Sequence, residues 1–284
     1  MLLKTKPMLT LRKRAPVLVA LSLLAVPAPC AAAAAHPKRG IASSRYLATQ
    51  PQALGRLGAA WAYDWSARAP AARGGPRWVP MVWGAGSVTA ATVSSLREAH
   101  RSRRARELLG FNEPDSSAQA NMTPERAAAL WPQLERTGLE LGSPAPAVPG
   151  DGWLGRFMSL AGKRHLRVDF IALHYYQDFT SPTAVSDLRR QLAGIHRKYR
   201  KPIWITEIGA LDVRGWGEPM TQAPTVGLAT TYMRKLFAML DALPYVARYA
   251  WFTDTCSNDD CPYSALLTAA GRPTSLGSAF RTTR

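Results

Sequence analysis

Two glutamates are the residues of this chain best suited to do chemistry. Glu113 follows the apolar run 108–111, and Glu207 ends the apolar run 203–206. A carboxylate next to a buried strand costs folding free energy unless it is solvated or hydrogen-bonded, so we expect a functional reason for both. Two carboxylates about 5–5.5 Å apart cleave a glycosidic bond by double displacement with retention, whereas a wider pair admits water and inverts. The alternative is a pair of structural acids, one of them bonded to a neighbouring arginine.

The other chemically notable residues also follow apolar runs, and they are aromatic, amide or imidazole side chains. They are Trp83, Asn112, His174, Tyr176 and Trp251. Aromatic rings cover the apolar face of a sugar, so this set favours a carbohydrate-binding cleft. The three tryptophan and tyrosine rings are predicted stacking platforms, although buried aromatic rings also plug barrels. His174 could bind substrate, orient Glu207, or be purely structural.

If these residues act together, the fold must bring the ends of several strands close to one another. Eight short, almost continuously apolar runs are typical of parallel strands buried on both faces, and we expect each to be followed by a turn and a helical pattern. The runs are 40–43, 60–64, 78–83, 107–111, 140–143, 168–174, 203–207 and 246–252. The helical patterns are 50–57, 89–101, 126–136, 153–161, 183–198, 221–240 and 275–280. We therefore predict an α/β fold, a single-domain (β/α)8 TIM barrel. A doubly wound sheet is the rival, but the turn after the first run lacks its phosphate-binding glycines.

Six longer motifs make the chain resemble glycoside hydrolase family 128, a group of endo-β-1,3-glucanases. The most specific are Gly-Phe-Asn-Glu-Pro-Asp at 110–115 and Trp-Ile-Thr-Glu at 204–207; the others lie at 78–84, 142–145, 169–176 and 249–252. The resemblance implies that Glu113 is the acid/base, that Glu207 is the nucleophile, and that Asn112 touches the sugar 2-hydroxyl. It implies a β-glucan polysaccharide as the partner. The chain departs from the family at 146–150, which lacks the usual Asn, and at 175, where Tyr replaces Trp.

The first 35 residues read as a secretory signal: basic residues, an apolar run at 15–26, and alanines at 31–35. We expect cleavage near Ala35, a secreted or periplasmic protein, and a catalytic domain at 36–284; a lipid-anchored Cys30 is the minor alternative. Cleavage lowers the formal net charge from +17 to +12 because residues 1–35 hold five positive and no negative charges. The basic cluster 101–106 is interpreted as a solvated helix end, because no aromatic residues interleave it as in a nucleic-acid binder.

Cys256 and Cys261 remain after cleavage, and an even pair in an oxidising compartment predicts a disulfide. Too few further ligands surround the pair for a zinc site. We expect no metal, no cofactor, no nucleic-acid partner, no membrane span, and a monomer. Two alternatives to a β-1,3-glucanase stay open: a retaining β-glycanase of other linkage specificity on the same barrel, and a carbohydrate-binding barrel that has lost catalysis.

Overall fold

The strands form a closed parallel ring. The computed structural model describes residues 36–72, 74–149, 152–256 and 261–283. Its strands are β1 (His36–Ala42), β2 (Ala59–Tyr63), β3 (Arg77–Trp78), β4 (Glu107–Leu108), β5 (Glu140–Leu141), β6 (Ile171–Tyr175), β7 (Ile203–Ile208) and β8 (Val246–Phe252). One sheet has the order β3-β2-β1-β8-β7-β6, and β4 pairs with β5. Parallel bridges join Met81 to Leu109 and Gly142 to Phe170, linking β3 to β4 and β5 to β6. The predicted (β/α)8 barrel is therefore confirmed.

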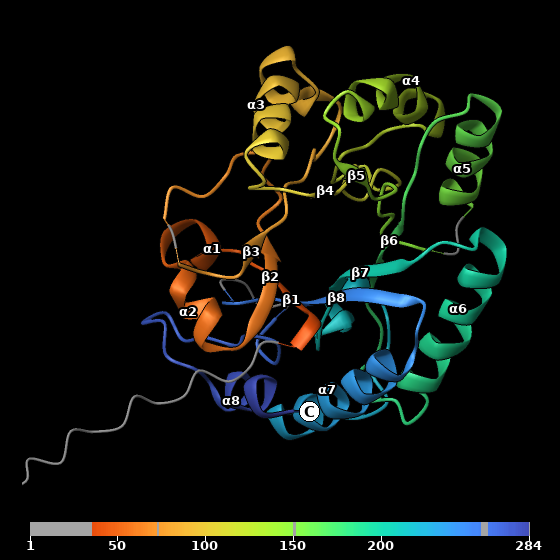
Figure 1. Ribbon diagram of the computed structural model, residues 1–284. Helices are drawn as coiled ribbons and strands as arrows, with labels where there is room; N and C mark the ends of the chain where they lie inside the picture. Colours follow the sequence, from red (N-terminus) through yellow and green to blue (C-terminus); the bar gives the residue numbers. More distant parts are fainter. Residues whose placement is uncertain (1–35, 73, 150–151, 257–260, 284) are drawn as a thin grey trace, which may run out of the picture. The chain divides into compact units, whose positions relative to one another are not determined.

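Helices surround the ring, as Figure 1 shows. They are α1 (Tyr46–Thr49), α2 (Pro51–Arg56), α3 (Ala90–Arg101), α4 (Pro124–Glu135), α5 (Trp153–Lys163), α6 (Ala184–Tyr199), α7 (Val226–Ala242) and α8 (Ser275–Thr282), with 3-10 turns η1 (Ala85–Ser87) and η2 (Val213–Trp216). Threonine hydroxyls at 89, 123, 225 and 274 accept the backbone N–H three residues on, which fixes where α3, α4, α7 and α8 begin. Within the described residues, no helix is long and apolar enough to cross a membrane.

The prediction that every strand is followed by a helix is wrong at one place. β2 and β3 are joined by residues 64–76, and the described part of this connection holds no helix. The segment carries Pro70, Gly74, Gly75 and Pro76, and these residues oppose helix formation. Strands β3, β4 and β5 are also shorter than predicted. In β3 the cause is Pro80, because proline has no N–H to donate to the ladder.

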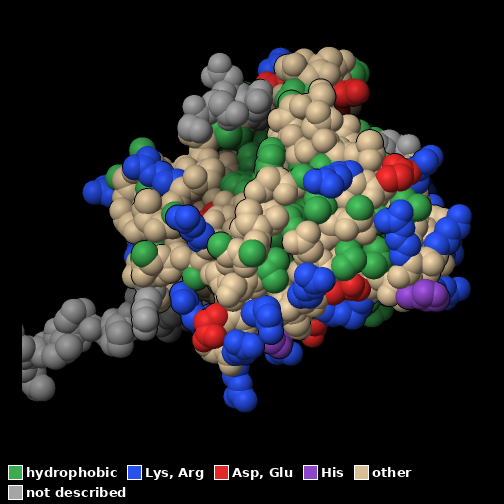
Figure 2. All heavy atoms as spheres, turned by 90° about the horizontal axis from the view of Figure 1, so that it is seen from above, with side chains coloured by type: hydrophobic (Ala, Val, Ile, Leu, Met, Phe, Trp, Pro, Cys, Tyr) green, Lys and Arg blue, Asp and Glu red, His purple; other side chains and the backbone are tan. Residues whose placement is uncertain are grey.

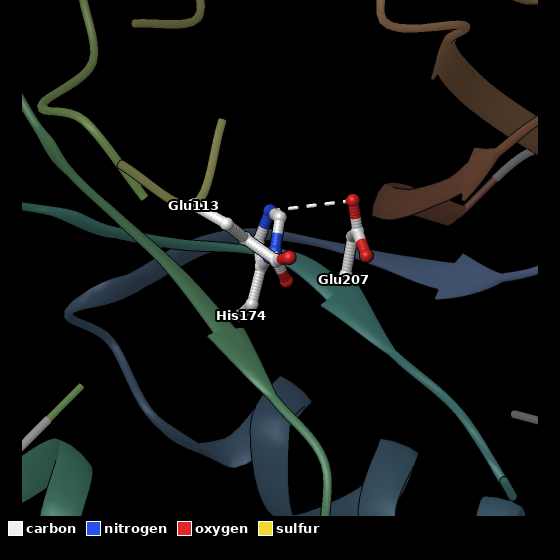
Figure 3. Close-up of side chains that lie close together, drawn as sticks. All are labelled: Glu113, His174 and Glu207. Atoms are coloured by element: carbon white, nitrogen blue, oxygen red, sulfur yellow. Dashed lines mark hydrogen bonds and ion pairs between the residues drawn. The ribbon is translucent and has the colours of Figure 1, made fainter. Parts of the chain in front are cut away.

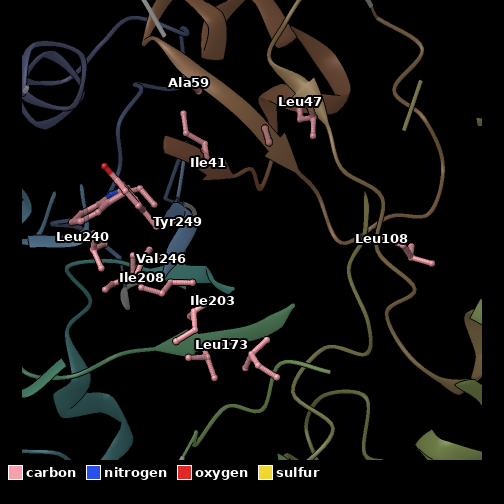
Figure 4. Close-up of a cluster of buried hydrophobic side chains, with 14 of the residues drawn as sticks. Ile41, Leu47, Ala59, Leu108, Leu173, Ile203, Ile208, Leu240, Val246 and Tyr249 are labelled. Carbon is pink, nitrogen blue, oxygen red and sulfur yellow. The ribbon is translucent and has the colours of Figure 1, made fainter. Parts of the chain in front are cut away.

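Two layers of apolar side chains stabilise the barrel. The larger one lies between strands and helices and includes Ile41, Leu173 and Val246 (Figure 4). The smaller one contains the large rings of Trp61 and Trp204. Trp204 stacks on Phe170 with 4.2 Å between ring centroids. This second layer also includes Tyr63, at the end of β2, and Trp83 packs against it, so it reaches the strand ends where the candidate site lies.

The predicted signal, 1–35, lies outside the described residues. The described residues all fall within one compact unit that spans Ala32–Arg284.

Candidate active site

Three ionisable side chains from different parts of the barrel meet at the strand ends (Figure 3). Glu113 follows β4, His174 lies on β6, and Glu207 lies on β7. Nδ1 of His174 is 2.8 Å from Oε1 of Glu113. Nε2 of His174 is 3.3 Å from Oε1 of Glu207. One ligand-type atom from each residue lies within 4.8 Å of those of the other two, so the two predicted carboxylates do come together.

Glu113 is held by an unusual backbone conformation. Its φ is +41°, in the left-handed region that a residue with a side chain rarely adopts. Its N–H donates to the carbonyl of Ala145 at 2.8 Å, which ties the segment after β4 to the segment after β5. Such a conformation costs about 1–3 kcal/mol and persists at functional sites where the surroundings enforce it. The side chain is 15% exposed, so it remains accessible to solvent.

Glu207 is fixed by three hydrogen-bond donors. Its Oε1 accepts from the Tyr63 hydroxyl at 2.9 Å and from Nε1 of Trp65 at 2.8 Å. Its Oε2 accepts from the Tyr176 hydroxyl at 2.5 Å. Burial, followed by the charge of Glu207, raises the pKa of both tyrosines well above the usual value, so both stay protonated donors. These three donors hold the Glu207 carboxylate in one orientation.

His174 connects the two carboxylates rather than facing a substrate. Its side chain is fully buried between Glu113 and Glu207. Burial alone lowers the pKa of this imidazole, but the charge of Glu207 and the hydrogen bond to Glu113 together raise it above the ordinary value. The prediction that His174 binds substrate is therefore wrong, because no part of the ring is accessible. The other interpretation, an orienting role, fits these contacts.

The remaining predicted residues divide between the surroundings of Glu207 and the core. Tyr176 contacts Glu207, and Trp83 is half-buried beside the inner aromatic layer. Asn112 donates to Gln119 at 3.3 Å and is nearly buried; its contact with a sugar hydroxyl stays a prediction. Trp251 was wrongly predicted as a stacking platform. It is fully buried, and its Nε1 donates to the carbonyl of Ser264, so its ring has no free face.

Sequence reasoning missed three residues around the site. Tyr63 lies within a predicted strand and was assigned no role there. The hydroxyl of a tyrosine near the end of an apolar run could have indicated a residue of the site. Asp115, the last residue of the motif 110–115, accepts the N–H groups of Ala147 and Val148 at 2.8 and 3.0 Å. Trp216, in η2, is 49% exposed and packs edge-on against Tyr176 with 5.7 Å between centroids. An isolated tryptophan in a loop offers no sequence signal for such a role.

Glu113, His174 and Glu207 are also, in type and spacing, a possible metal-binding set. Their contacts fit this use poorly. Both oxygens of Glu207 already accept O–H or N–H donors, and Nδ1 of His174 is engaged by Glu113. The arrangement fits a hydrogen-bonded pair of carboxylates better than a cation site.

The predicted disulfide between Cys256 and Cys261 is present, with 5.5 Å between the Cα atoms. It follows β8, on the face where the strands end. Residues 257–260 between the cysteines lie outside the described part of the chain.

Comparison with known proteins identifies what this site resembles. A family model described as "Glycosyl hydrolase catalytic core" matches residues 41–280. A glutamate-to-alanine variant of a subgroup I GH128 endo-β-1,3-glucanase from Amycolatopsis mediterranei, solved with laminaripentaose, is 38% identical; the match covers 88% of this chain and 100% of that one, with a TM-score of 0.77. A subgroup III curdlan-specific exo-β-1,3-glucanase from Blastomyces gilchristii, solved with glucose, is 27% identical over 87% of this chain and 100% of that one, with a TM-score of 0.67. Alkali-sensitive linkage protein 1 of Schizosaccharomyces pombe is 35% identical over 153 residues. The match covers 51% of this chain and only 26% of that protein.

Proposed function

This chain belongs to glycoside hydrolase family 128 and is a glycoside hydrolase, and from that premise we propose that it is a retaining endo-β-1,3-glucanase. The observation that carries the proposal is the Glu113–His174–Glu207 cluster at the strand ends of a barrel. The substrate class is supported by the Amycolatopsis enzyme, which shares 38% of its sequence and was solved with a laminarioligosaccharide.

In the proposed first step, a carboxylate oxygen of Glu207 attacks the anomeric carbon of the sugar. The bond from that carbon to the bridging oxygen breaks, and Glu113 gives its proton to the departing oxygen. The product is a glycosyl ester on Glu207 and a free sugar end. In the second step Glu113 takes a proton from water, the resulting hydroxyl oxygen attacks the same carbon, and Glu207 leaves as a carboxylate.

The spacing of the two carboxylates supports retention over inversion. Their nearest oxygens fall within 4.8 Å of each other. An inverting enzyme separates its carboxyl groups by about 6.5–9.5 Å so that a water molecule fits between the base and the sugar. In a retaining enzyme the nucleophilic carboxylate itself must reach the anomeric carbon, so the two carboxyl groups lie closer together. The three donors around Glu207 support the role of nucleophile, because they hold its carboxylate in one orientation.

Purified protein incubated with laminarin, curdlan, cellulose, xylan and mannan tests the proposal. We expect laminarin and curdlan to be cleaved into a range of oligosaccharides, with the β-anomer appearing first in the proton NMR spectrum. Release of glucose alone would indicate exo action, as in the subgroup III relative. First appearance of the α-anomer would contradict retention, and cleavage of another polymer in place of β-1,3-glucan would contradict the substrate.

A carbohydrate-binding barrel without catalysis is the weaker candidate. It has no need for two carboxylates joined by a buried histidine, and it predicts binding of laminarin without new reducing ends.

We also propose that the protein is exported and loses residues 1–35. The basis is the order of basic, apolar and alanine-rich segments at the start of the chain. Intact-mass measurement of exported material checks this. A mature chain that begins at a lipid-modified Cys30 would contradict it.

A further inference from the structure

The disulfide between Cys256 and Cys261 lies beside residues that hold Glu207. The Lys and Arg side chains on the face that Figure 2 shows are scattered and mark no single site. Around the disulfide, by contrast, the contacts are concentrated. Leu211, Val213 and Cys261 form a buried apolar cluster in the segments that follow β7 and β8. We call these three residues the disulfide cluster.

The disulfide cluster supports side chains that contact Glu207. Partly buried side chains pack against it, and two of them, Tyr176 and Phe252, belong to the surroundings of the site. The hydroxyl of Tyr176 donates to Oε2 of Glu207 at 2.5 Å. Phe252 meets the rings of Tyr176 and Trp65 edge-on, with 5.9 and 6.0 Å between ring centroids. Because Trp65 donates to Oε1 of Glu207, the cluster supports donors to both carboxylate oxygens.

Other contacts anchor the chain on either side of the disulfide. Asp254, just before it, accepts hydrogen bonds from the segment after β1. Ser264, just after it, is fully buried: its hydroxyl accepts the N–H of Ala210 at 3.2 Å, and its carbonyl accepts Nε1 of Trp251 at 2.8 Å. The cysteines are five residues apart, and so short a loop adds less to the stability of the whole chain than a long one would. Loss of the bond should therefore loosen the cluster and leave the barrel folded.

Reduction of the bond changes the packing of the cluster. A dithiol reductant transfers two electrons and two protons to the two sulfurs, the S–S bond breaks, and the reductant closes into a cyclic disulfide. Two unbonded sulfur atoms need a wider separation than two bonded ones. Cys261 is only 3% exposed, so this displacement must be taken up by Leu211, Val213 or the rings packed against them.

We propose that the Cys256–Cys261 disulfide is a positioning element for Glu207 that acts through Tyr176 and Phe252. The oxidised protein holds the donors against the carboxylate, and the dithiol form holds them loosely, so that bond formation to the sugar slows. This role rests on the proposed function, in which Glu207 attacks the anomeric carbon. A misplacement of about 1 Å caused by a change far from the chemistry costs about 10²-fold in rate. The loss falls on bond formation, so kcat should change more than KM.

Reversible reduction of one protein tests this. A Cys30→Ser background leaves Cys256 and Cys261 as the only cysteines of the chain. Its kcat and KM for laminarihexaose are measured in the oxidised form, after reduction with dithiothreitol, and after reoxidation. We expect kcat to fall about tenfold or more on reduction and to return on reoxidation, with KM changed less than about threefold. An activated 2-deoxy-2-fluoro-β-laminaribioside, which esterifies the nucleophile Glu207, should inactivate the reduced form more slowly by the same factor.

Two variants separate positioning from stability. The double variant Cys256→Ser with Cys261→Ser should have the low kcat of the reduced protein and should not respond to dithiothreitol. Leu154→Ala truncates a buried side chain of α5 outside the disulfide cluster, and it should lower Tm while the oxidised protein keeps its wild-type kcat. A fall of kcat in Leu154→Ala equal to that of the double variant would overturn the proposal, because loss of stability alone would then explain both.

Hydrogen exchange gives a second readout that needs no hydrolysis. Exchange of the backbone N–H groups of residues 209–218 should speed up about tenfold on reduction, while that of β1 and β8 stays unchanged. Equal exchange in the two forms, or values of kcat that agree within about twofold, would show that the disulfide does not position the site. If the oxidised protein cleaves no β-1,3-glucan, the proposed function fails, and the exchange of residues 209–218 still decides whether the disulfide holds this segment in place.

Discussion

At the scale of single residues, the candidate site surrounds its carboxylates with neutral donors and one histidine. In the part of the chain that the structure describes, no Lys or Arg pairs with Glu113 or Glu207. Two tyrosine hydroxyls and an indole N–H contact Glu207 instead. A cation would form stronger, charge-assisted hydrogen bonds to Glu207, whereas these neutral donors orient the carboxylate without a fixed positive charge beside it.

The first prediction separates the roles of the two glutamates. Glu113→Ala should lower turnover of β-glucan by about 10²–10⁴-fold, because the leaving oxygen receives no proton. An aryl glycoside with a good leaving group needs little protonation, so this variant should still form the glycosyl-enzyme. Azide needs no general base and should restore its turnover, giving a β-glycosyl azide. In Glu207→Ala, azide should attack directly and give the α-product. Reversed anomeric configurations, read by NMR, would refute the assignment.

The second prediction concerns His174 and pH. Its pKa is raised in the folded protein above the ordinary 6.5. The stabilisation from its protonated form is therefore fully present below about pH 6.5 and is lost as the pH rises through the folded pKa. The free energy of unfolding, measured in urea, should fall over this range in wild type and less steeply in His174→Asn. His165→Asn, at an exposed position, should follow wild type. Parallel curves for all three proteins would show that His174 is not the titrating group.

The third prediction places Trp216 among the substrate contacts. Its exposed ring lies against Tyr176, which itself contacts Glu207. Loss of one stacking ring costs about 0.5–1.5 kcal/mol, so Trp216→Ala should raise KM for laminarin about twofold to tenfold and leave kcat nearly unchanged. Val226→Ala removes another exposed apolar side chain near the same loop and should alter neither constant. A fall in kcat alone would instead indicate that Trp216 positions Tyr176.

At the scale of elements, the site depends on how the segments after the strands are tied together. Asp115, after β4, accepts two backbone N–H groups of the segment after β5. The N–H of Glu113 returns a hydrogen bond to Ala145 in that same segment. The left-handed backbone of Glu113 is thus held from both sides, and the carboxylate points toward His174 as a result.

The fourth prediction follows from these ties. Asp115→Ala leaves two N–H groups without their acceptor, at a cost of about 1–3 kcal/mol. In a domain of this size each kcal/mol lowers Tm by about 2–4 °C. We expect a lower Tm together with lower activity on laminarin, and a smaller effect of both kinds from Asp115→Asn, which keeps one acceptor oxygen. Wild-type activity at a lowered Tm would mean that the segment does not control Glu113.

The sequence was sufficient for the strands but not for the connections. Apolar runs reveal buried parallel strands because both faces of each strand are covered. The glutamates at 113 and 207 were visible for the same reason, as charges next to such runs. The loop contacts of Asp115 depend on partners distant in sequence, Ala147 and Val148. The missing helix between β2 and β3 has a local cause, the prolines and glycines of residues 64–76. Trp251 was misjudged because periodicity does not tell whether a ring at a strand end faces the cleft or the helices.

At the scale of the whole molecule, one buried carboxylate joins the beginning of the barrel to its end. Asp254 follows β8 and is fully buried. It accepts from the hydroxyl of Ser43 at 2.6 Å, and from the N–H groups of Ser44 and Tyr46 at 2.8 and 2.6 Å. These three donors follow β1, so Asp254 reinforces the β1–β8 pairing that closes the ring.

The fifth prediction is that this carboxylate stabilises the closed barrel. Asp254→Ala leaves several buried donors unsatisfied, each costing about 1–3 kcal/mol, and should lower Tm more than Asp115→Ala does. Asp187→Ala on the outer helix α6 breaks a surface pair with Arg190 and an exposed hydrogen bond from the Thr183 hydroxyl, and should change Tm little. Calorimetry measures all three. A Tm for Asp254→Ala close to that of Asp187→Ala would show that other contacts close the barrel.

The pairing of β1 with β8 also determines when the barrel can close during synthesis. A ribosome makes β1 first and β8 almost last, after residue 245. Until then β1 can pair only with β2, and its apolar side chains lack the contacts that β8 later provides. Contacts between residues so distant along the chain form slowly. Until they form, the incomplete barrel exposes unpaired strand edges that favour aggregation. Closure of the ring therefore waits for the last 39 residues, 246–284, which take about 2–8 seconds to make at about 5–20 residues per second.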